Sequence, residues 1–373
     1  MPNKPNQPSL DELRISISEV DQQLMELIQK RMHLCEQVGE YKKIRNLPIK
    51  DYGIEKKIIE RVRREARDSG LDEGLFESIF KTLIEHSVMI QDELHKRASD
   101  LPTDHKTVLI IGGHGLMGRW LAQLFESFGH KVQIFDPKVE ESSPYPVVKN
   151  LEDGCVHADF MILATPISTT AETIEAIIPF NPKGVLVEIC SLKSTVIPAL
   201  EKARQSGIQV CSIHPMFGPT ATTLAGRNMI ICQSEGHAYQ EIEEILKKTS
   251  ASLIHIPLKD HDRLMGYVLG SAHLLNLLFA KVMSTSEFSL PSLLSVAGTT
   301  FLKQLDVTKE VVSENQDLYF EIQALNNESP ALLEGFRSSL DGFEKAIIHK
   351  DRDHFKTQMA STDDFFREKN EQT

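Results

Sequence analysis

Apolar residues recur at helical spacing through most of the first hundred positions. Between positions 10 and 45 they recur every three or four residues, without proline and with Gly39 as the one glycine. This pattern predicts one helix of roughly 35 residues, which is too long for an ordinary globular helix and needs a partner along its length. Ser9 and Glu12 are expected to form a capping box at its start. Two further helices are predicted at 54–69 and 75–97.

From position 107 the pattern changes to short apolar runs that alternate with helical stretches. Strands are predicted at 108–111, 132–135, 160–164, 185–189, 210–213, 229–232 and 253–256. Such alternation indicates a parallel α/β sheet. The remainder is expected to be helical, with helices at 264–284, 290–312, 315–326, 330–348 and 351–369. The chain therefore reads as multidomain, and we predict an all-α segment at 1–97, a linker at 98–106, an α/β Rossmann-type domain at 107–256 and an all-α domain at 257–373.

Composition narrows the class of protein. A net charge of −12 argues against nucleic acid as a main partner. The apolar runs fall short of the 18 or so residues that span a membrane, and the polar start of the chain lacks the apolar core of a signal peptide. The five cysteines are odd in number and form no C-x-x-C pair. They predict reduced thiols in a cytoplasmic protein, and no metal site is predicted.

A glycine pattern lies between the first predicted strand and the helix that follows it. Gly113, Gly115 and Gly118 have the spacing of the dinucleotide-binding fingerprint, with Leu116 and Met117 in the same turn. Free N–H groups at the helix start suit a pyrophosphate. Asp136 ends the second strand, where an acid binds the ribose hydroxyls and repels a 2′-phosphate. The sequence therefore predicts NAD as the cofactor.

Three later strand ends carry candidate chemistry, because ligands bind outside the carboxyl ends of parallel strands. Thr165 and Pro166 follow one strand and are expected to face the cofactor. Ser191 and Lys193 follow the next, where the lysine either binds a substrate carboxylate or caps a helix. His214 ends a third strand in the run HPMFGP and suits proton transfer near neutral pH.

Positive charge interrupts the apolar stripe of the first helix. Arg31 and Lys42 lie within about 20° of each other and about 16 Å apart along the axis, so they either converge on an anion or extend to solvent from the edge of the stripe. Ser87 and Gln91 share one face of the third helix. Arg14 is about 25 Å from Arg31 along a straight helix. A site that uses both arginines therefore requires a dimer.

Residues 10–97 resemble the all-helical chorismate mutases. The resemblance implies an intertwined homodimer that rearranges chorismate to prephenate. It implies that cations hold the substrate carboxylates, while lysine and glutamine side chains face the ether oxygen. At the family's functional positions this chain has Arg14, Arg31, Lys42, Asp51, Glu55, Ser87 and Gln91. Ile54 stands where the family commonly has a second arginine.

Residues 107–373 resemble the prephenate dehydrogenases through the motifs GGHGLMG, SLK and HPMFGP. The resemblance implies oxidative decarboxylation of prephenate to 4-hydroxyphenylpyruvate, in which His214 accepts the ring-hydroxyl proton as hydride passes to NAD. His261 and His273 match family histidines. Glu310 aligns where the family has a substrate-binding arginine, and Lys303 or Lys309 is the alternative cation. The whole chain is thus similar to the bifunctional chorismate mutase/prephenate dehydrogenases of tyrosine biosynthesis, which implies tyrosine as a feedback inhibitor.

Two other interpretations stay open on the sequence. In one, the chain is a single-activity NAD-dependent dehydrogenase whose N-terminal helices only dimerise or sense a ligand. In the other it is a catalytically silent NAD-binding regulator, which leaves His214 and the mutase residues without a purpose. Ile54 and Glu310 are the departures that favour the first of these.

Overall fold

A computed structural model describes residues 9–45, 47, 51–94, 106–138, 143–233 and 238–367. The chain divides into two compact units. The first contains the N-terminal helices and most of the sheet domain. The second contains residues 166–171 and 190–200 together with everything from Pro257 onward. Two strand-end segments of the predicted nucleotide domain thus cluster with the C-terminal helices. The predicted linker at 98–106 lies outside the described residues apart from Lys106.

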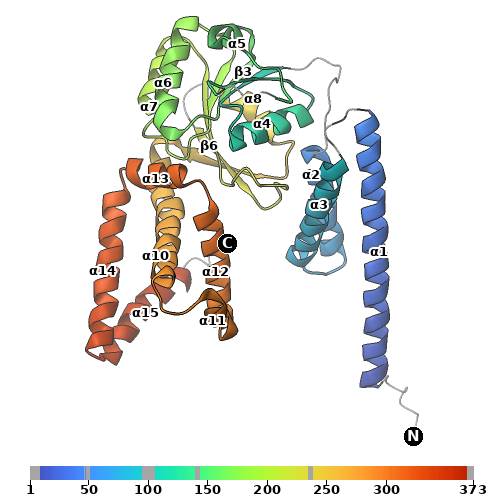
Figure 1. Cartoon of the computed structure of the whole chain (residues 1–373), viewed down its shortest axis with the longest axis vertical. Coiled ribbons are helices and arrows are strands. Elements are labelled where there is room, and N and C mark those ends of the chain that lie inside the picture. The colour runs from blue at the N-terminus through green and yellow to red at the C-terminus, as the bar shows by residue number, and fades with distance from the viewer. Residues whose placement is uncertain are drawn as a thin grey trace. The chain divides into compact units, whose positions relative to one another are not determined.

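Three helices open the first unit: α1 (Leu10–Ile44), α2 (Tyr52–Asp68) and α3 (Glu73–Leu94). The prediction of one long first helix is confirmed, and Figure 1 shows α1 as a single uninterrupted rod. Its capping box is also present: Ser9 N donates to Glu12 Oε2 at 2.7 Å, and Glu12 N donates to Ser9 Oγ at 3.2 Å. The two reciprocal bonds satisfy backbone donors that a helix start otherwise leaves unpaired.

The first unit also contains a seven-stranded sheet, in the order β2-β1-β3-β4-β5-β6-β7. Neighbouring strands from β2 through β5 run parallel. The strands are β1 (Thr107–Ile111), β2 (Lys131–Phe135), β3 (Phe160–Leu163), β4 (Val185–Glu188), β5 (Val210–Pro215), β6 (Asn228–Gln233) and β7 (Ser252–Pro257). The expectation of a parallel sheet is wrong at one place, because β6 pairs with β5 antiparallel. The loop between them contains no crossover helix, and only such a crossover would return the chain in the parallel direction.

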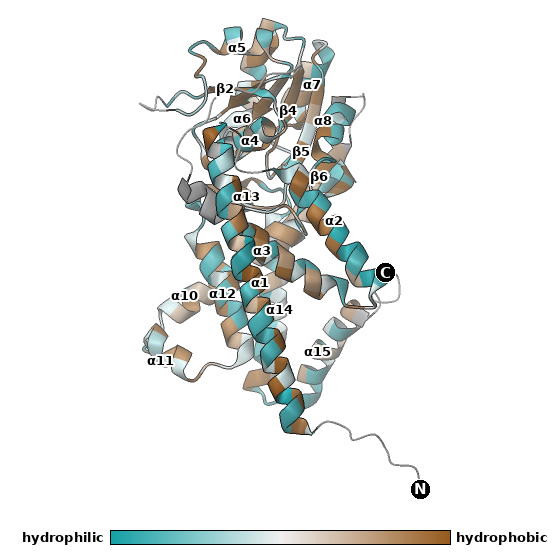
Figure 2. Cartoon of the chain, turned by 90° about the vertical axis from the view of Figure 1, so that its right-hand side faces the viewer, coloured by the Kyte–Doolittle hydropathy of each residue, from teal (hydrophilic) through white to brown (hydrophobic). Residues whose placement is uncertain are grey.

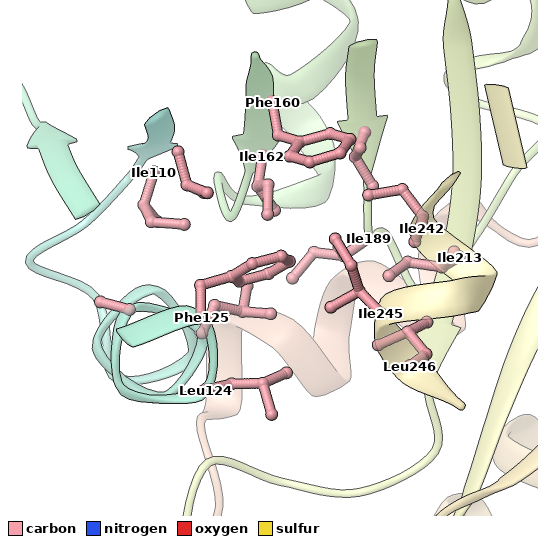
Figure 3. Packing of buried hydrophobic residues seen from close by; sticks show 14 of the residues in the cluster. Ile110, Leu124, Phe125, Phe160, Ile162, Ile189, Ile213, Ile242, Ile245 and Leu246 are labelled. Carbon is pink, nitrogen blue, oxygen red and sulfur yellow. The ribbon is translucent and has the colours of Figure 1, made fainter. Parts of the chain in front are cut away.

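Helices cover both faces of this sheet: α4 (Leu116–Ser127), α5 (Leu151–His157), α6 (Ile167–Ile177), α7 (Ile197–Gln205) and α8 (Ala238–Leu246). On one face Leu124 and Phe125 of α4 pack with Ile110 of β1 and with α8 in a single buried cluster (Figure 3). On the opposite face the backbone of α5 approaches Leu109 at Gly154. Successive residues of β1 therefore pack against the helices on opposite faces of the sheet. Because both faces are covered, the strand is apolar throughout.

The second unit is helical after Pro257. It contains α9 (His261–Met265), a π-helical turn at Gly266–Ser271, α10 (Ala272–Ser284), α11 (Leu290–Ser295), α12 (Thr299–Ser313), α13 (Gln316–Leu325), α14 (Ser329–Ile348) and α15 (Arg352–Arg367). The single helix predicted at 290–312 is wrong, since the chain breaks at 296–298 and Gly298 caps α12. A Cβ at Gly266 would lie 3.1 Å from Leu332, so this glycine lets α14 approach closely.

One helical run, Leu258–Ser284, is long and apolar enough to cross a membrane by length and composition alone. Only 22% of its most apolar window is buried, and Figure 2 marks several apolar stretches on the helices of this unit. The sequence analysis predicts no membrane-spanning run because it considers uninterrupted apolar stretches. In the structure, α9, the π turn and α10 join into one helix that is longer than any such stretch. The test is weak evidence for a membrane span, since core helices of soluble proteins also pass it.

Candidate functional sites

The glycine loop between β1 and α4 has the geometry of a phosphate-binding turn. A Cβ at Gly113 would lie 2.4 Å from Ile134, and one at Gly118 would lie 2.2 Å from the carbonyl oxygen of Gly112. These two glycines permit close packing of the loop on β2 and on the helix start. Gly115 is the N-cap of α4, and a Cβ at this position would lie 3.2 Å from the carbonyl oxygen of Gly112. Leu116, 71% exposed, and Met117 follow in the first turn of α4. The backbone at the helix start is thus shaped to accept a pyrophosphate.

Gly112 is a loop residue that the three-glycine pattern missed. Its φ is +85°, which only glycine adopts readily, and a Cβ there would lie 2.5 Å from Ala164 O. This close approach brings the end of β3, and with it Thr165, against the glycine loop. Pro166 follows, immediately before α6, and its carbonyl accepts hydrogen bonds from the N–H groups of Thr169 and Thr170 in the first turn of that helix. The Gly-Gly pair in the sequence was the available signal.

Asp136 lies where the sequence predicts the ribose-binding acid. It follows β2, and its Oδ2 accepts a hydrogen bond of 3.0 Å from the backbone N–H of His114 in the glycine loop. Its Oδ1 accepts one of 2.9 Å from Lys138 N. The carboxylate stays half-exposed, so it is fixed in direction beside the loop and still faces solvent. This arrangement fits a dinucleotide whose ribose hydroxyls donate to Asp136.

His214 is on β5, is 3% exposed, and is paired in register with Ile230 of β6. Two residues earlier, the hydroxyl of Ser212 donates to Oε1 of Glu188 at the end of β4. Glu188 and Ser212 are both buried, so this bond fixes the carboxyl ends of two adjacent strands. The chain places a histidine at the strand edge where ligands of α/β sheets bind.

A carboxylate organises the candidate substrate loop in the second unit. Asp262 accepts hydrogen bonds of 2.7 Å from the backbone N–H groups of Lys193 and Ser194, and one of 2.8 Å from His261 Nδ1. Burial acts to raise the pKa of Asp262, but these donors outweigh it and hold that pKa well below its usual range. Lys193 and His261 are both fully buried, and Ser191 is half-buried in the same loop. Sequence reasoning named Ser191, Lys193 and His261 but missed Asp262.

His273 and Tyr319 stack with ring centroids 4.1 Å apart. Burial lowers the pKa of His273 to about 4, so its ring is neutral at pH 7. The pKa of Tyr319 is raised by burial and then by the charges of Glu314 and Glu310. Glu310 in α12 therefore lies near an aromatic pair, where the sequence resemblance expects a cation.

Among the N-terminal helices, Arg31 on α1 and Ser87 on α3 are hydrogen-bonded to each other. Arg31 Nη1 donates to Ser87 Oγ at 2.6 Å and to the carbonyl of Leu83 at 2.8 Å. The thiol of Cys35 also donates to Ser87 Oγ, at 3.2 Å. Arg31 thus points from α1 across to α3.

Lys42 lies near the start of α2. Its burial lowers its pKa, while the negative charge of Asp51 and the nearby Cys35 act in the opposite direction. Asp51 caps α2 by accepting 2.9 Å from the N–H of Ile54. Lys42 and Arg31 both lie in the C-terminal half of α1. Gln91 lies in α3, and its side chain is outside the described residues.

Two predicted residues are placed elsewhere. Arg14 is near the other end of α1, with a 70% exposed side chain that pairs with Asp11 at 3.4 Å. Glu55 is 5% exposed, and its Oε1 accepts from Thr223 Oγ1, Leu224 N, Ala225 N and Ser250 Oγ. These donors belong to the sheet domain, far away in sequence. The first turn of α2 therefore contacts that domain directly.

Comparison with protein families covers most of the chain. Residues 13–92 match the model for chorismate mutase type II. Residues 128–255 match the prephenate dehydrogenase nucleotide-binding domain, and residues 257–361 match the prephenate dehydrogenase dimerization domain. The nucleotide-binding match begins after the glycine loop, so the loop geometry adds separate support for a dinucleotide.

Individual relatives agree with the families. The T-protein of Haemophilus influenzae is 24% identical over 368 residues, which cover 98% of this chain and 94% of that protein. The probable arogenate/prephenate dehydrogenase of Methanocaldococcus jannaschii is 26% identical over 260 residues, 67% of this chain, and the chain spans 58% of that relative. A crystal structure of prephenate dehydrogenase from A. aeolicus superposes with a TM-score of 0.57 at 18% identity, covering 72% of this chain and 99% of that one. This last likeness shows the fold.

Proposed function

We propose residue roles for a chain that belongs to the bifunctional chorismate mutase/prephenate dehydrogenases of tyrosine biosynthesis. Such a chain rearranges chorismate to prephenate and oxidatively decarboxylates prephenate to 4-hydroxyphenylpyruvate with NAD. The match of residues 13–92 to a mutase family carries the first activity, and it favours the bifunctional interpretation over the single-activity one.

The dehydrogenase half uses the strand ends of the sheet domain. Gly113, Gly115 and Gly118 hold the pyrophosphate, and Asp136 binds the ribose hydroxyls. Bound NAD supplies the acceptor for the hydride that leaves the substrate ring. His214 takes the proton of the ring hydroxyl, a task for which histidine is the most common general base. Loss of CO₂ makes the ring aromatic and drives the step forward.

The substrate side of the dehydrogenase draws on the second unit. Lys193 is the cation for a substrate carboxylate, and Ser191 and His261 are the polar groups beside it. Asp262 positions these residues, because it fixes the loop backbone at 193–194 and orients the ring of His261 through Nδ1. Glu310 removes the cation expected on α12, so the prephenate side chain depends on Lys193 or on another lysine.

The mutase half uses Arg31, Lys42 and Ser87 from one chain. Arg31 binds a carboxylate, held in direction by Ser87 and Leu83 O. Lys42 and Gln91 are the donors assigned to the ether oxygen, which gains negative charge as the C–O bond breaks. Donors that are fixed before the reaction stabilise that charge without further rearrangement. Burial lowers the pKa of Lys42, and the negative charge of Asp51 offsets part of that effect.

The active species is a homodimer. Apolar residues along the N-terminal half of α1 are exposed in the single chain, among them Leu13, Ile17, Val20 and Leu24 at 46 to 61%. A stripe of this length is unusual for a monomer and marks a surface for association. The match to a dimerization domain at 257–361 points the same way and accounts for the exposed apolar face of Leu258–Ser284. Arg14 then reaches the mutase site of the partner chain.

The enzyme is cytoplasmic, binds neither nucleic acid nor membrane, and is inhibited by its pathway's end product, tyrosine. The net charge of −12 and the relationship to T-proteins support this setting. The test of the whole assignment is a pair of steady-state assays, one with chorismate and one with prephenate and NAD. Turnover in both supports the bifunctional enzyme, turnover in the second alone leaves a single-activity dehydrogenase, and turnover in neither rejects the proposal.

A further inference from the structure

The carboxylate of Glu55, on the first turn of α2, is held by the sheet domain. Its Oε1 receives Thr223 Oγ1 at 2.7 Å, Leu224 N at 2.8 Å and Ala225 N at 3.1 Å, and the hydroxyl of Ser250 completes the set. All four donors use the same oxygen. A buried carboxylate needs such donors, because an ionised group without them is costly to bury.

Aromatic rings join the same turn of α2 to the catalytic half. Tyr52 is 1% exposed, and its ring lies 5.9 Å from that of Trp120 on α4. Trp120 in turn contacts Phe217 edge-on at 5.1 Å, and its indole N–H donates to the carbonyl of Ala221 at 3.0 Å. Phe217 lies in HPMFGP, three positions after His214. Trp120 thus lies between Tyr52, which follows Asp51, and the loop after His214, the proposed base.

The contact extends along α2 and α3. Ile59 and Ile84 pack with Ala225 in one buried cluster, and Lys56 Nζ donates to the carbonyl of Lys247 at 2.5 Å. On the far side, Met216 N donates to Asn228 O, so the two ends of the loop at 216–227 are tied at the β5–β6 junction. The loop is therefore held at its ends by the sheet and in its middle by α2.

We propose that the first turn of α2, Tyr52–Glu55, is a positioning element for the dehydrogenase. It holds the loop at 216–227 in place, so that the mutase segment supports the reaction at His214 without touching its substrate. Glu55 fixes the backbone at 223–225, and Tyr52 fixes the aromatic contacts of Trp120 and Phe217. Because Asp51 caps this turn and its charge acts on Lys42 of the mutase site, the two activities share one turn of helix. This inference rests on the role proposed for His214.

The sheet-domain side of the contact provides a test that leaves the mutase residues intact. In the full-length enzyme, Thr223→Val combined with Ser250→Ala removes two side-chain donors to Glu55 and preserves most of the volume. Thr249→Val is the matched control, since Thr249 is equally buried at 2% but its hydroxyl bonds only to Leu246 O and Ala251 N. Thr223→Ser keeps the donor and should behave as the wild type.

Trp120 is the only tryptophan in the chain, so its fluorescence reports on this contact without any substrate. The double variant should show increased acrylamide quenching of Trp120 and an about three- to tenfold lower kcat/KM for prephenate, the scale of one ordinary lost hydrogen bond. Tyr52→Leu should increase quenching as well. Calorimetric titration with NAD checks that the sheet domain remains folded.

Three results would overturn the inference. Unchanged quenching in both the double variant and Tyr52→Leu would mean that α2 does not cover Trp120 in solution. Increased quenching with an unchanged kcat/KM would mean that the contact exists but positions nothing. An equal loss in Thr249→Val would assign the effect to general weakening of the domain. The quenching results do not depend on His214, so this inference and its catalytic role can fail separately.

Discussion

The guanidinium of Arg31 on α1 donates a hydrogen bond of 2.6 Å to the hydroxyl of Ser87 on α3 within a single chain. Arg14 lies on the same unbroken helix, about 25 Å away along its axis. One small ligand therefore cannot contact Arg14 and Arg31 of the same chain. A mutase site that uses both must combine two chains.

Complementation between two inactive variants tests this shared site. Arg14→Ala and Arg31→Ala homodimers should each be nearly inactive as mutases, because every site lacks one cation. After unfolding and refolding of an equal mixture, about half the dimers are mixed, by counting for a two-fold symmetric dimer. Each mixed dimer contains one intact site, so mutase activity should return to about a quarter of the wild-type value. No recovery in verified mixed dimers would show that each site uses one chain.

The rate of the mutase reaction should fall at high pH as Lys42 loses its proton. Burial lowers the pKa of Lys42, so the fall should begin below the usual lysine value of 10.5. Asp51 acts to raise that pKa, and Asp51→Asn should move the fall to still lower pH. Lys42→Arg should abolish it, because arginine stays charged throughout. The measurement is kcat/KM for chorismate against pH, and an alkaline limb that survives in Lys42→Arg belongs to another group.

Replacing the proposed base should separate the two activities. His214→Asn should reduce the rate of prephenate oxidation about 10²–10⁴-fold, the usual contribution of a general base. Chorismate turnover should survive in the same preparation and serves as the folding control. Prephenate oxidation near the wild-type rate in this variant would exclude His214 as the base.

Cofactor choice should depend on Asp136. The wild type should prefer NAD strongly over NADP, because a 2′-phosphate would meet a carboxylate fixed by the N–H groups of His114 and Lys138. Asp136→Ala should relax this preference. The comparison is the ratio of kcat/KM for the two cofactors, and equal use of both by the wild type would refute the assignment.

The presence of Glu310, where the family resemblance expects an arginine, should weaken prephenate binding in the wild type. Glu310→Arg should lower KM for prephenate and leave the affinity for NAD nearly unchanged. It should also lower the pKa of Tyr319, which Glu310 now helps to raise. A KM that stays the same or rises would mean that another cation, such as Lys303 or Lys309, already holds the carboxylate.

Local patterns in the sequence were enough to predict most elements of the fold. The capping box of Ser9 and Glu12, the length of α1 and all seven strands follow from features within a few residues of each other. The direction of β6 and the break before α12 did not, because pairing direction depends on where the loop returns. At the break, Gly298 was a visible signal that the apolar periodicity concealed.

Partners that are distant in sequence explain what was missed in the sites. Arg31 and Ser87 were both expected at the mutase site from the family resemblance, and their hydrogen bond across two helices could not be found from the periodicity of either one. The sequence predicted no role for Asp262, because its donors at 193–194 come from another segment of the chain. Glu55 was expected at a substrate, and its donors from Thr223 to Ser250 could not be found from the helix alone.

The exposed apolar stripe of α1 has a consequence for how the protein forms. A helix whose outer half faces water gains little from folding in an isolated chain, since helical stability in proteins comes mostly from packing. The last step in building the mutase segment is then an encounter between two chains, and its rate depends on how many are present. The apolar face of Leu258–Ser284 is also exposed in the single chain, so a newly made subunit completes neither half before it meets a partner, and the cell's rate of synthesis decides how long that interval lasts.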